Sequence, residues 1–325
     1  MTLSDATLAR LAELVDAPDL SDTRYELRGR VGRGGMGTIW RAFDRELGRE
    51  VALKVMNGPD PRPGGIARLR TEAQVLARLE HPGLVPVHDI GSLPDGRLFY
   101  AMKLVRGRRL DEHARALPFL AARLRLLEKI CEAVAFAHAH GVIHRDLKPQ
   151  NVMVGSFGEV LVLDWGVAKL MTEAAPEIAD DGAALEAAPP VAVDVDAATL
   201  TAAGTVLGTP GYMSPEQARG ESGVGVAADV YALGALLSFL AGDDPPRAVV
   251  AMVARARAPR PEDRYPSVAE LQEDVARFLS GGPVSAYAEG PLETARRLAT
   301  KYRTPLVLVA AYLVMRVVLA VVARI

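Results

Sequence analysis

The chain has 325 residues, of which 50% are hydrophobic and 24% are charged, and its formal net charge is −2. This composition is that of a globular protein rather than a disordered or fibrous one, and the balanced charge gives no indication of nucleic-acid binding. The single cysteine, Cys131, excludes an internal disulfide and favours a reducing compartment.

The first third of the chain is expected to consist mostly of strands. Leucines recur at helical spacing near the N-terminus and predict a short leader helix within residues 1–24. Beyond it, short apolar or alternating segments bounded by glycine and proline predict strands, and one longer segment with a single apolar face predicts a helix. The strands are expected within residues 27–40, 50–56, 84–90 and 98–105, and the helix over residues 66–79.

The remainder of the chain is expected to be mostly helical. After Gly107 an apolar stripe runs over residues 124–137 and ends before Gly141, and a Ser-x-x-Glu capping box at Ser267 opens a later helix. Residues 172–199 are rich in Ala, Pro, Glu and Asp and predict an acidic loop. A strand-rich half followed by a helix-rich half predicts an α+β fold with two lobes. Two short strands are expected over residues 151–154 and 160–163, and a further helix over residues 227–240.

Residues 32–37 form a G-x-G-x-x-G loop, whose glycines permit close approach of backbone N–H groups to phosphate oxygens. A dinucleotide-binding fold uses the same spacing, but there a helix follows the loop and an acidic residue stands about twenty positions on. Here residues 38–40 predict a strand, and the later position holds Lys54. The pattern favours a loop folded over ATP; the alternative is a glycine-rich hairpin turn without a ligand.

Lys54 stands in the middle of a short apolar strand. A buried ammonium group is costly without an anionic partner. Glu72 lies on the following predicted helix, on the side that faces the strands. A Lys54–Glu72 ion pair would orient the lysine toward the phosphates, whereas the alternative for Glu72 by itself is a solvated charge on the helix surface.

Residues 144–151, His-Arg-Asp-Leu-Lys-Pro-Gln-Asn, form a polar cluster between an apolar helix and an apolar strand. Asp146 can accept the proton of an attacking hydroxyl, Lys148 can neutralise a γ-phosphate, and the side-chain oxygen of Asn151 can bind a hard cation. Asp164 follows another apolar strand and is well placed to bridge a metal and phosphates. The alternative is an ordinary polar loop, which the spacing disfavours.

These segments occur in the order and spacing of the protein-kinase signature set. Over residues 25–279 the chain resembles the bacterial members of the eukaryotic-like serine/threonine protein kinases. The resemblance implies a bilobal kinase fold, with a small antiparallel-sheet N-lobe that carries one main helix and a mostly helical C-lobe. It also implies that the chain binds ATP and Mg²⁺ between the lobes and phosphorylates serine and threonine hydroxyls of proteins.

The resemblance assigns roles to individual residues. Asp146 takes the position of the catalytic base with Lys148 beside it, and Lys54 and Glu72 take those of the ion pair. Asn151 and Asp164 are the implied magnesium ligands. The implied nucleotide-binding residues are Val31, Gly32, Gly34, Gly37, Ile39, Ala52, Lys54, the gatekeeper Met102, and the hinge residues Lys103 and Val105.

The resemblance also implies how the catalytic loop is braced and regulated. Arg145, next to the catalytic base, is the residue expected to meet a phosphate on the activation loop. Autophosphorylation in trans between two copies, at Thr205 or Thr201, would supply that phosphate. In the same way Glu216 is expected to pair with Arg264, and Asp229 to brace the catalytic loop.

The chain departs from the family pattern at two places. Trp165 stands where phenylalanine is usual, and the segment between Leu240 and Pro261 is several tens of residues shorter than in most members, so the C-lobe is expected to be shortened. Two alternatives to an active protein kinase are therefore a membrane-tethered ATP-binding pseudokinase that acts as a scaffold and a small-molecule phosphotransferase of the same fold.

Residues 306–323 form an almost continuous apolar run, interrupted by Arg316 and preceded by basic residues. On an insertion scale the apolar residues outweigh the arginine, which favours a C-terminal membrane anchor with the kinase on the cytoplasmic face of the bacterial inner membrane. The alternative is a buried or dimer-forming helix. The predicted domains are a leader (1–24), the kinase N-lobe (25–105), the C-lobe (106–280) with the activation loop (164–216), a basic linker (281–304) and the apolar helix (305–323).

Overall fold

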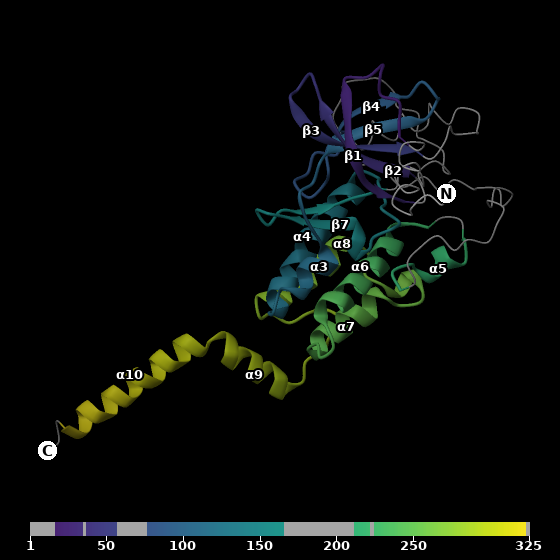
Figure 1. The fold of residues 1–325 in the computed structure, drawn as a ribbon. Coiled ribbons are helices and arrows are strands. Elements are labelled where there is room, and N and C mark those ends of the chain that lie inside the picture. Colours follow the sequence, from purple (N-terminus) through teal and green to yellow (C-terminus); the bar gives the residue numbers. More distant parts are fainter. Residues whose placement is uncertain (1–16, 35–36, 57–76, 166–210, 222–223, 323–325) are drawn as a thin grey trace, which may run out of the picture.

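The computed structural model describes residues 17–34, 37–56, 77–165, 211–221 and 224–322, and it shows an N-terminal and a C-terminal lobe (Figure 1). The N-lobe is a five-stranded sheet in the order β1-β2-β3-β5-β4, in which every neighbouring pair is antiparallel. The predicted leader helix, and all but the end of the helix predicted over residues 66–79, fall outside the described residues. The strands are β1 (Tyr25–Arg33), β2 (Gly37–Asp44), β3 (Arg49–Met56), β4 (Val87–Ser92) and β5 (Leu98–Lys103).

The alternation along β3 decides which residues reach the space between the lobes. Leu53 and Val55 point into the N-lobe core, so Lys54, between them, points to the opposite face of the sheet. The register pairs Lys54 with Ile39 on β2 and with Tyr100 on β5. The sheet therefore places a lysine and a tyrosine side by side on the face that turns toward the C-lobe.

The C-lobe is built around three helices that contact one another, α4, α6 and α8. The predicted apolar stripe of α4 is confirmed, since Leu124, Leu127, Ile130 and Val134 are fully buried. A three-stranded sheet, β6-β7-β8, lies on this helical layer. The elements are β6 (Gly107–Arg109), α3 (Leu110–Arg115), α4 (Leu120–Ala139), β7 (Val152–Gly155), β8 (Val160–Val162), α5 (Pro215–Ala218), α6 (Val226–Ala241), α7 (Arg247–Ala256) and α8 (Val268–Leu279).

Helices α3, α5, α7 and α9 were not predicted individually from the sequence. Helix α7 lies within the segment between Leu240 and Pro261, where the sequence analysis expected a shortened C-lobe, and it buries Val249, Met252 and Ala256. Their spacing of three and four residues was the signal for this helix. Helix α9 (Pro291–Lys301) lies within the predicted basic linker. It begins with a proline, a common first helical residue, but it buries no side chain.

The C-terminal helices α9 and α10 (Arg303–Val322) lead away from the C-lobe (Figure 1). Arg297 of α9 holds the connection to the lobe, because it pairs with Glu289 at 2.8 Å and donates to the carbonyl of Gly281 at 3.1 Å. Every α10 side chain that the structure describes is exposed. Within the described part of the chain, we find no helix that is both long and apolar enough to cross a membrane. Ala323, the last residue of the predicted apolar helix, falls outside that part.

Candidate active site

The glycine-rich segment connects β1 and β2 at the edge of the N-lobe. The backbone N–H of Gly34 donates to the carbonyl of Gly37 at 2.9 Å, which closes the turn. At Gly37 an added Cβ would lie 2.5 Å from the carbonyl oxygen of Val55, so this position requires glycine. At Gly32 an added Cβ would meet nothing within 4 Å, so this part of the loop borders open space. The two middle residues of the motif, 35 and 36, fall outside the described residues.

Lys54 forms an ion pair with Asp164, with 2.7 Å between Nζ and Oδ1. Burial favours the neutral amine, but the charges and hydrogen bonds of Tyr100 and Asp164 outweigh it and raise the pKa of Lys54. Burial likewise would raise the pKa of Asp164, yet Lys54 holds it below its usual value. The sequence placed both residues in the site without predicting this pairing. Glu72, the predicted partner of Lys54, falls outside the described residues.

Two side chains of the polar cluster in residues 144–151 converge on the carboxylate of a third. Lys148 Nζ lies 2.8 Å from Asp146 Oδ2, and Asn151 Nδ2 donates to the same oxygen at 3.1 Å. Asn151 Nδ2 also lies 2.8 Å from the backbone carbonyl of Asp146. The structure thus brings together the predicted catalytic residues Asp146 and Lys148 and the predicted metal ligand Asn151.

The cluster also interacts electrostatically with Asp164, which follows β8. Burial would raise the pKa of Asp164, but the charge of Lys148 acts with that of Lys54 to lower it. The Asp146 side chain is about one third exposed (34%), as is that of Asp164 (33%). Two partly accessible carboxylates and two ammonium groups therefore face a shared space between the lobes.

Asp229 of α6 braces the catalytic loop, as the resemblance implied. Its side chain is fully buried and accepts the backbone N–H groups of His144 and Arg145, each at 2.8 Å. His138 Nε2 donates to it as well, at 2.8 Å. Burial would raise the pKa of Asp229, but these donors lower it. The carboxylate thus stays charged where it holds the loop.

The predicted pairing of Glu216 with Arg264 is also confirmed. Arg264 Nη1 and Nη2 lie 2.7 and 2.8 Å from the two carboxylate oxygens, a bidentate arrangement in which the Arg264 side chain is fully buried. Arg264 also donates to the backbone carbonyls of Ala227 and Ala258, at 2.8 Å each. The pair ties α5 to α6 and to the segment before α8.

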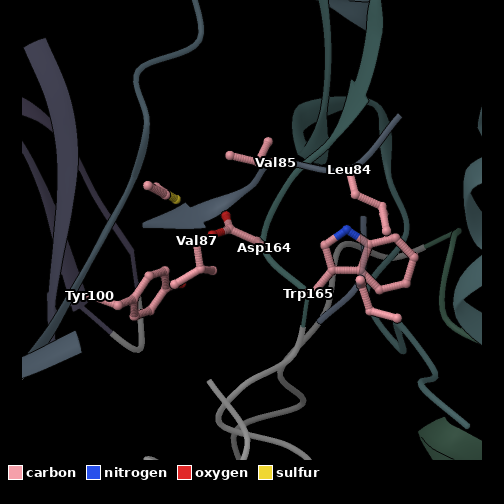
Figure 2. Close-up of a pocket in the computed structure, with 8 residues that line it drawn as sticks. Leu84, Val85, Val87, Tyr100, Asp164 and Trp165 are labelled. Atoms are coloured by element: carbon pink, nitrogen blue, oxygen red, sulfur yellow. The ribbon is translucent and has the colours of Figure 1, made fainter. Parts of the chain in front are cut away.

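Asp164, the partner of Lys54, also lines a small, mostly apolar cavity (Figure 2). Its lining includes two residues that the sequence analysis placed in the site, Met102 and Asp164, and Tyr100, which the sequence analysis did not assign to the site. In Figure 2, Tyr100 and Val87 lie on the N-lobe side of Asp164, and Trp165 lies beyond it. Trp165 is held in place because its Nε1 donates to the carbonyl of Val162 at 3.1 Å. The remaining lining residues are Leu79, Leu84 and Val85.

The other predicted nucleotide-binding residues lie on neighbouring strands of the N-lobe or just after them. Ala52 on β3 is buried and pairs with Met102 on β5. Val31 on β1 is 56% exposed. Lys103 ends β5, and Val105 follows it in the connection to the C-lobe. The strands therefore align these residues along one border of the space between the lobes.

Comparison with known proteins agrees with this arrangement. The chain matches the protein kinase domain over residues 25–280. It is 35% identical over 302 residues to serine/threonine-protein kinase PknA of Mycobacterium tuberculosis, and the aligned region covers 87% of this chain and 64% of PknA. It is 38% identical over 266 residues to the DNA damage-responsive serine/threonine-protein kinase RqkA of Deinococcus radiodurans, and the aligned region covers 79% of this chain and 36% of RqkA.

A solved structure shows the same architecture. The crystal structure of the Mycobacterium tuberculosis PknI kinase domain aligns with a TM-score of 0.55 at 25% sequence identity, over 78% of this chain and 95% of that domain. The present chain spans less than two thirds of the length of the curated relatives PknA and RqkA. The domain match over most of its length, together with the two-lobed fold, shows that the chain belongs to the protein kinase family.

Proposed function

We propose that the chain is a serine/threonine protein kinase that transfers the γ-phosphoryl group of ATP to hydroxyls of protein substrates. The observation that carries the proposal is the convergence of Lys148 and Asn151 on the Asp146 carboxylate, at 2.8 and 3.1 Å. Across the same space Lys54 and Asp164 supply a second ammonium and a second carboxylate. Phosphoryl transfer requires little more than positioning of the reactants and stabilisation of charge, which these groups can provide.

Each side chain has a distinct task in this proposal. Asp146 Oδ2 accepts the proton of the substrate hydroxyl, and Lys148 stabilises negative charge on the transferring group. Asn151 commits its Nδ2 to Asp146, so its Oδ1 is the atom left to bind a cation. An amide oxygen and the Asp164 carboxylate form the hard oxygen donor set that Mg²⁺ prefers, so the residues present fit that ion. When bound, Mg²⁺ would neutralise the phosphate oxygens.

The nucleotide is proposed to lie beneath the glycine-rich turn. Gly32, Gly34 and Gly37 would allow backbone N–H groups to approach the phosphates, and Lys54 would bind the phosphate oxygens. The adenine ring would lie between the N-lobe residues and the connection to the C-lobe. The residues proposed to surround it are Val31, Ile39, Ala52, Met102, Lys103 and Val105.

The proposed activating modification is autophosphorylation of Thr205 or Thr201 by a second copy of the chain. Both threonines fall outside the described residues. The support is that Arg145, the expected partner of such a phosphate, directly precedes Asp146. A phosphate bound there would act one residue away from the proposed base.

Autophosphorylation of the full chain tests the proposed function. With ATP and Mg²⁺ the wild type is expected to incorporate phosphate on threonine, and mapping should locate it at Thr201 or Thr205. The Asp146→Asn variant removes the proposed general base, so the rate should fall by about 10²- to 10⁴-fold. A nucleotide-dependent thermal shift without phosphate transfer would instead support the pseudokinase scaffold. Preference for small alcohols over a generic protein substrate would support the small-molecule phosphotransferase.

We also propose that α10 attaches the kinase to a membrane, on its cytoplasmic face. The support is that Leu308 (65% exposed) and Leu313 (56% exposed) belong to a helix whose described side chains are all exposed. Basic residues of α9 precede it and suit anionic lipid headgroups. In flotation with anionic phospholipid vesicles, the full chain is expected to float and Leu308→Asp/Leu313→Asp to remain in the soluble fraction. A wild type that stays soluble and dimeric would contradict the attachment and favour the dimer-forming helix.

A further inference from the structure

The residue that precedes the proposed base has an unusual backbone conformation. Arg145 has a φ of 64°, which is uncommon for any residue other than glycine. Such a conformation persists only when the surrounding structure holds it in place. Because the carbonyl of Arg145 belongs to the peptide that begins Asp146, whatever holds that carbonyl also orients the Asp146 side chain.

Two side chains from different helices hold Arg145 by its backbone. Asp229 on α6 accepts its N–H at 2.8 Å, the bracing contact already described. On the other side, Nε2 of Gln217, on α5, donates to its carbonyl at 2.7 Å. Asp229 therefore orients the peptide before Arg145, and Gln217 orients the peptide between Arg145 and Asp146.

Gln217 is itself oriented by the start of its helix. Its Oε1 accepts the backbone N–H of Ser214 at 3.2 Å and the Ser214 hydroxyl at 3.1 Å. These contacts leave the Nε2 group directed at the Arg145 carbonyl. Helix α5 has only four residues, but the buried Glu216–Arg264 pair anchors it to the rest of the C-lobe. The amide is thus fixed at both ends.

We propose that Gln217 is a positioning residue, which holds Asp146 in the orientation needed to accept the proton of the substrate hydroxyl. The inference rests on the proposed function and extends it. Gln217 also links the position of α5, which follows the activation segment in the chain, to the geometry of the base. A shift of α5 would act on the Arg145–Asp146 peptide through a single hydrogen bond.

The substitution Gln217→Glu tests this directly in the full chain. It preserves shape, and one oxygen can still accept from Ser214, but the other oxygen would face the Arg145 carbonyl without a proton. Because a misplacement of about 1 Å can cost on the order of 10²-fold in rate, kcat should fall by about 10- to 100-fold. The KM for ATP should stay within about twofold, since no proposed nucleotide contact is altered. A kcat within twofold of wild type would overturn the proposal.

Ser214→Ala is the matched control. It removes the hydroxyl contact to Gln217 Oε1 and weakens the start of α5. It keeps the backbone N–H contact that orients Gln217, and it leaves the Gln217–Arg145 bond in place. We expect it to lower Tm with little change in kcat. If Ser214→Ala and Gln217→Glu lose kcat equally, Gln217 acts only through the stability of α5, and the positioning role is wrong.

Hydrogen–deuterium exchange separates this inference from the proposed function. The amides of residues 144–151 should exchange faster in Gln217→Glu than in wild type or Ser214→Ala, whether or not the wild type transfers phosphate. If the wild type is inactive but this exchange pattern is seen, the kinase proposal is contradicted, while the link from Gln217 to the Arg145–Asp146 peptide stands. Unchanged exchange in Gln217→Glu would refute the link itself.

Discussion

Replacing Lys54 with methionine is expected to reduce kcat for phosphoryl transfer by about 10²- to 10³-fold, the usual effect of removing one electrostatic donor from an active site. The substitution keeps the length and apolar character of the side chain, so β3 should retain its packing. It removes the partner of Asp164 at 2.7 Å, and burial would then raise the pKa of Asp164. The proposed magnesium ligand would lose its ion-pair partner, and the phosphates would lose a cation.

Steady-state kinetics of the full chain would measure this effect. Lys129→Met provides a matched control, because Lys129 is exposed on α4 and its amine donates to the carbonyl of Gly158 at the turn between β7 and β8. The control should keep kcat close to the wild-type value. If Lys54→Met kept wild-type kcat as well, the proposed role of the Lys54–Asp164 pair in transfer would be wrong.

Breaking the Glu216–Arg264 pair is expected to have the largest effect on stability. Arg264→Met leaves the buried Glu216 carboxylate without its two donors and removes the contacts to the carbonyls of Ala227 and Ala258. Loss of one partner of a buried ion pair typically costs about 3–5 kcal/mol in the free energy of unfolding. Chemical denaturation of the full chain would measure the loss. Arg219→Met is the control, since Arg219 pairs with Glu221 at an exposed site, where such pairs contribute little.

The same pair makes stability depend on pH in a defined direction. Burial would raise the pKa of Glu216, but the hydrogen bonds and charge of Arg264 hold it below its usual value. A carboxyl with a lowered pKa in the folded state stabilises the protein above the unfolded pKa, and this contribution disappears as the pH falls. The difference in the free energy of unfolding between wild type and Glu216→Gln should therefore be largest at neutral pH and should decrease below about pH 4. A difference that is constant from pH 7 to pH 3 would contradict this account.

Local patterns predicted much of the fold and of the candidate site. The apolar stripe of α4 and the strand around Lys54 follow from periodicity, and Asp146, Lys148 and Asn151 lie within eight consecutive residues, 144–151, whose side chains the loop brings together. Helices α7 and α9 were missed for different reasons. Helix α7 does carry an apolar stripe, but the stripe is short and lies in a segment flanked by prolines, which resembles an irregular connection. Helix α9 buries no side chain.

Contacts between distant segments were harder to predict. The pairing of Lys54 with Asp164 joins residues 110 positions apart, and the Gln217 contact to Arg145 joins residues 72 apart. The Ser-x-x-Gln pattern at the start of α5 is that of a capping box at Ser214, but a cap specifies only contacts within its own helix. Likewise, nothing in the sequence indicates that Tyr100 differs from other strand residues, and only the strand register shows that it lies opposite Lys54.

By itself the sequence determined the kinase family and the residues able to carry out phosphoryl transfer, because both depend on residue type and short spacing along the chain. Only the tertiary structure decided which of these groups pair, which are braced and how the base is oriented. The physical reason is that a hydrogen bond or ion pair forms only over about 3 Å. Distances of that size are set by the packing between the lobes, for β3, and by the packing within the C-lobe, for the 144–151 loop, α5 and α6.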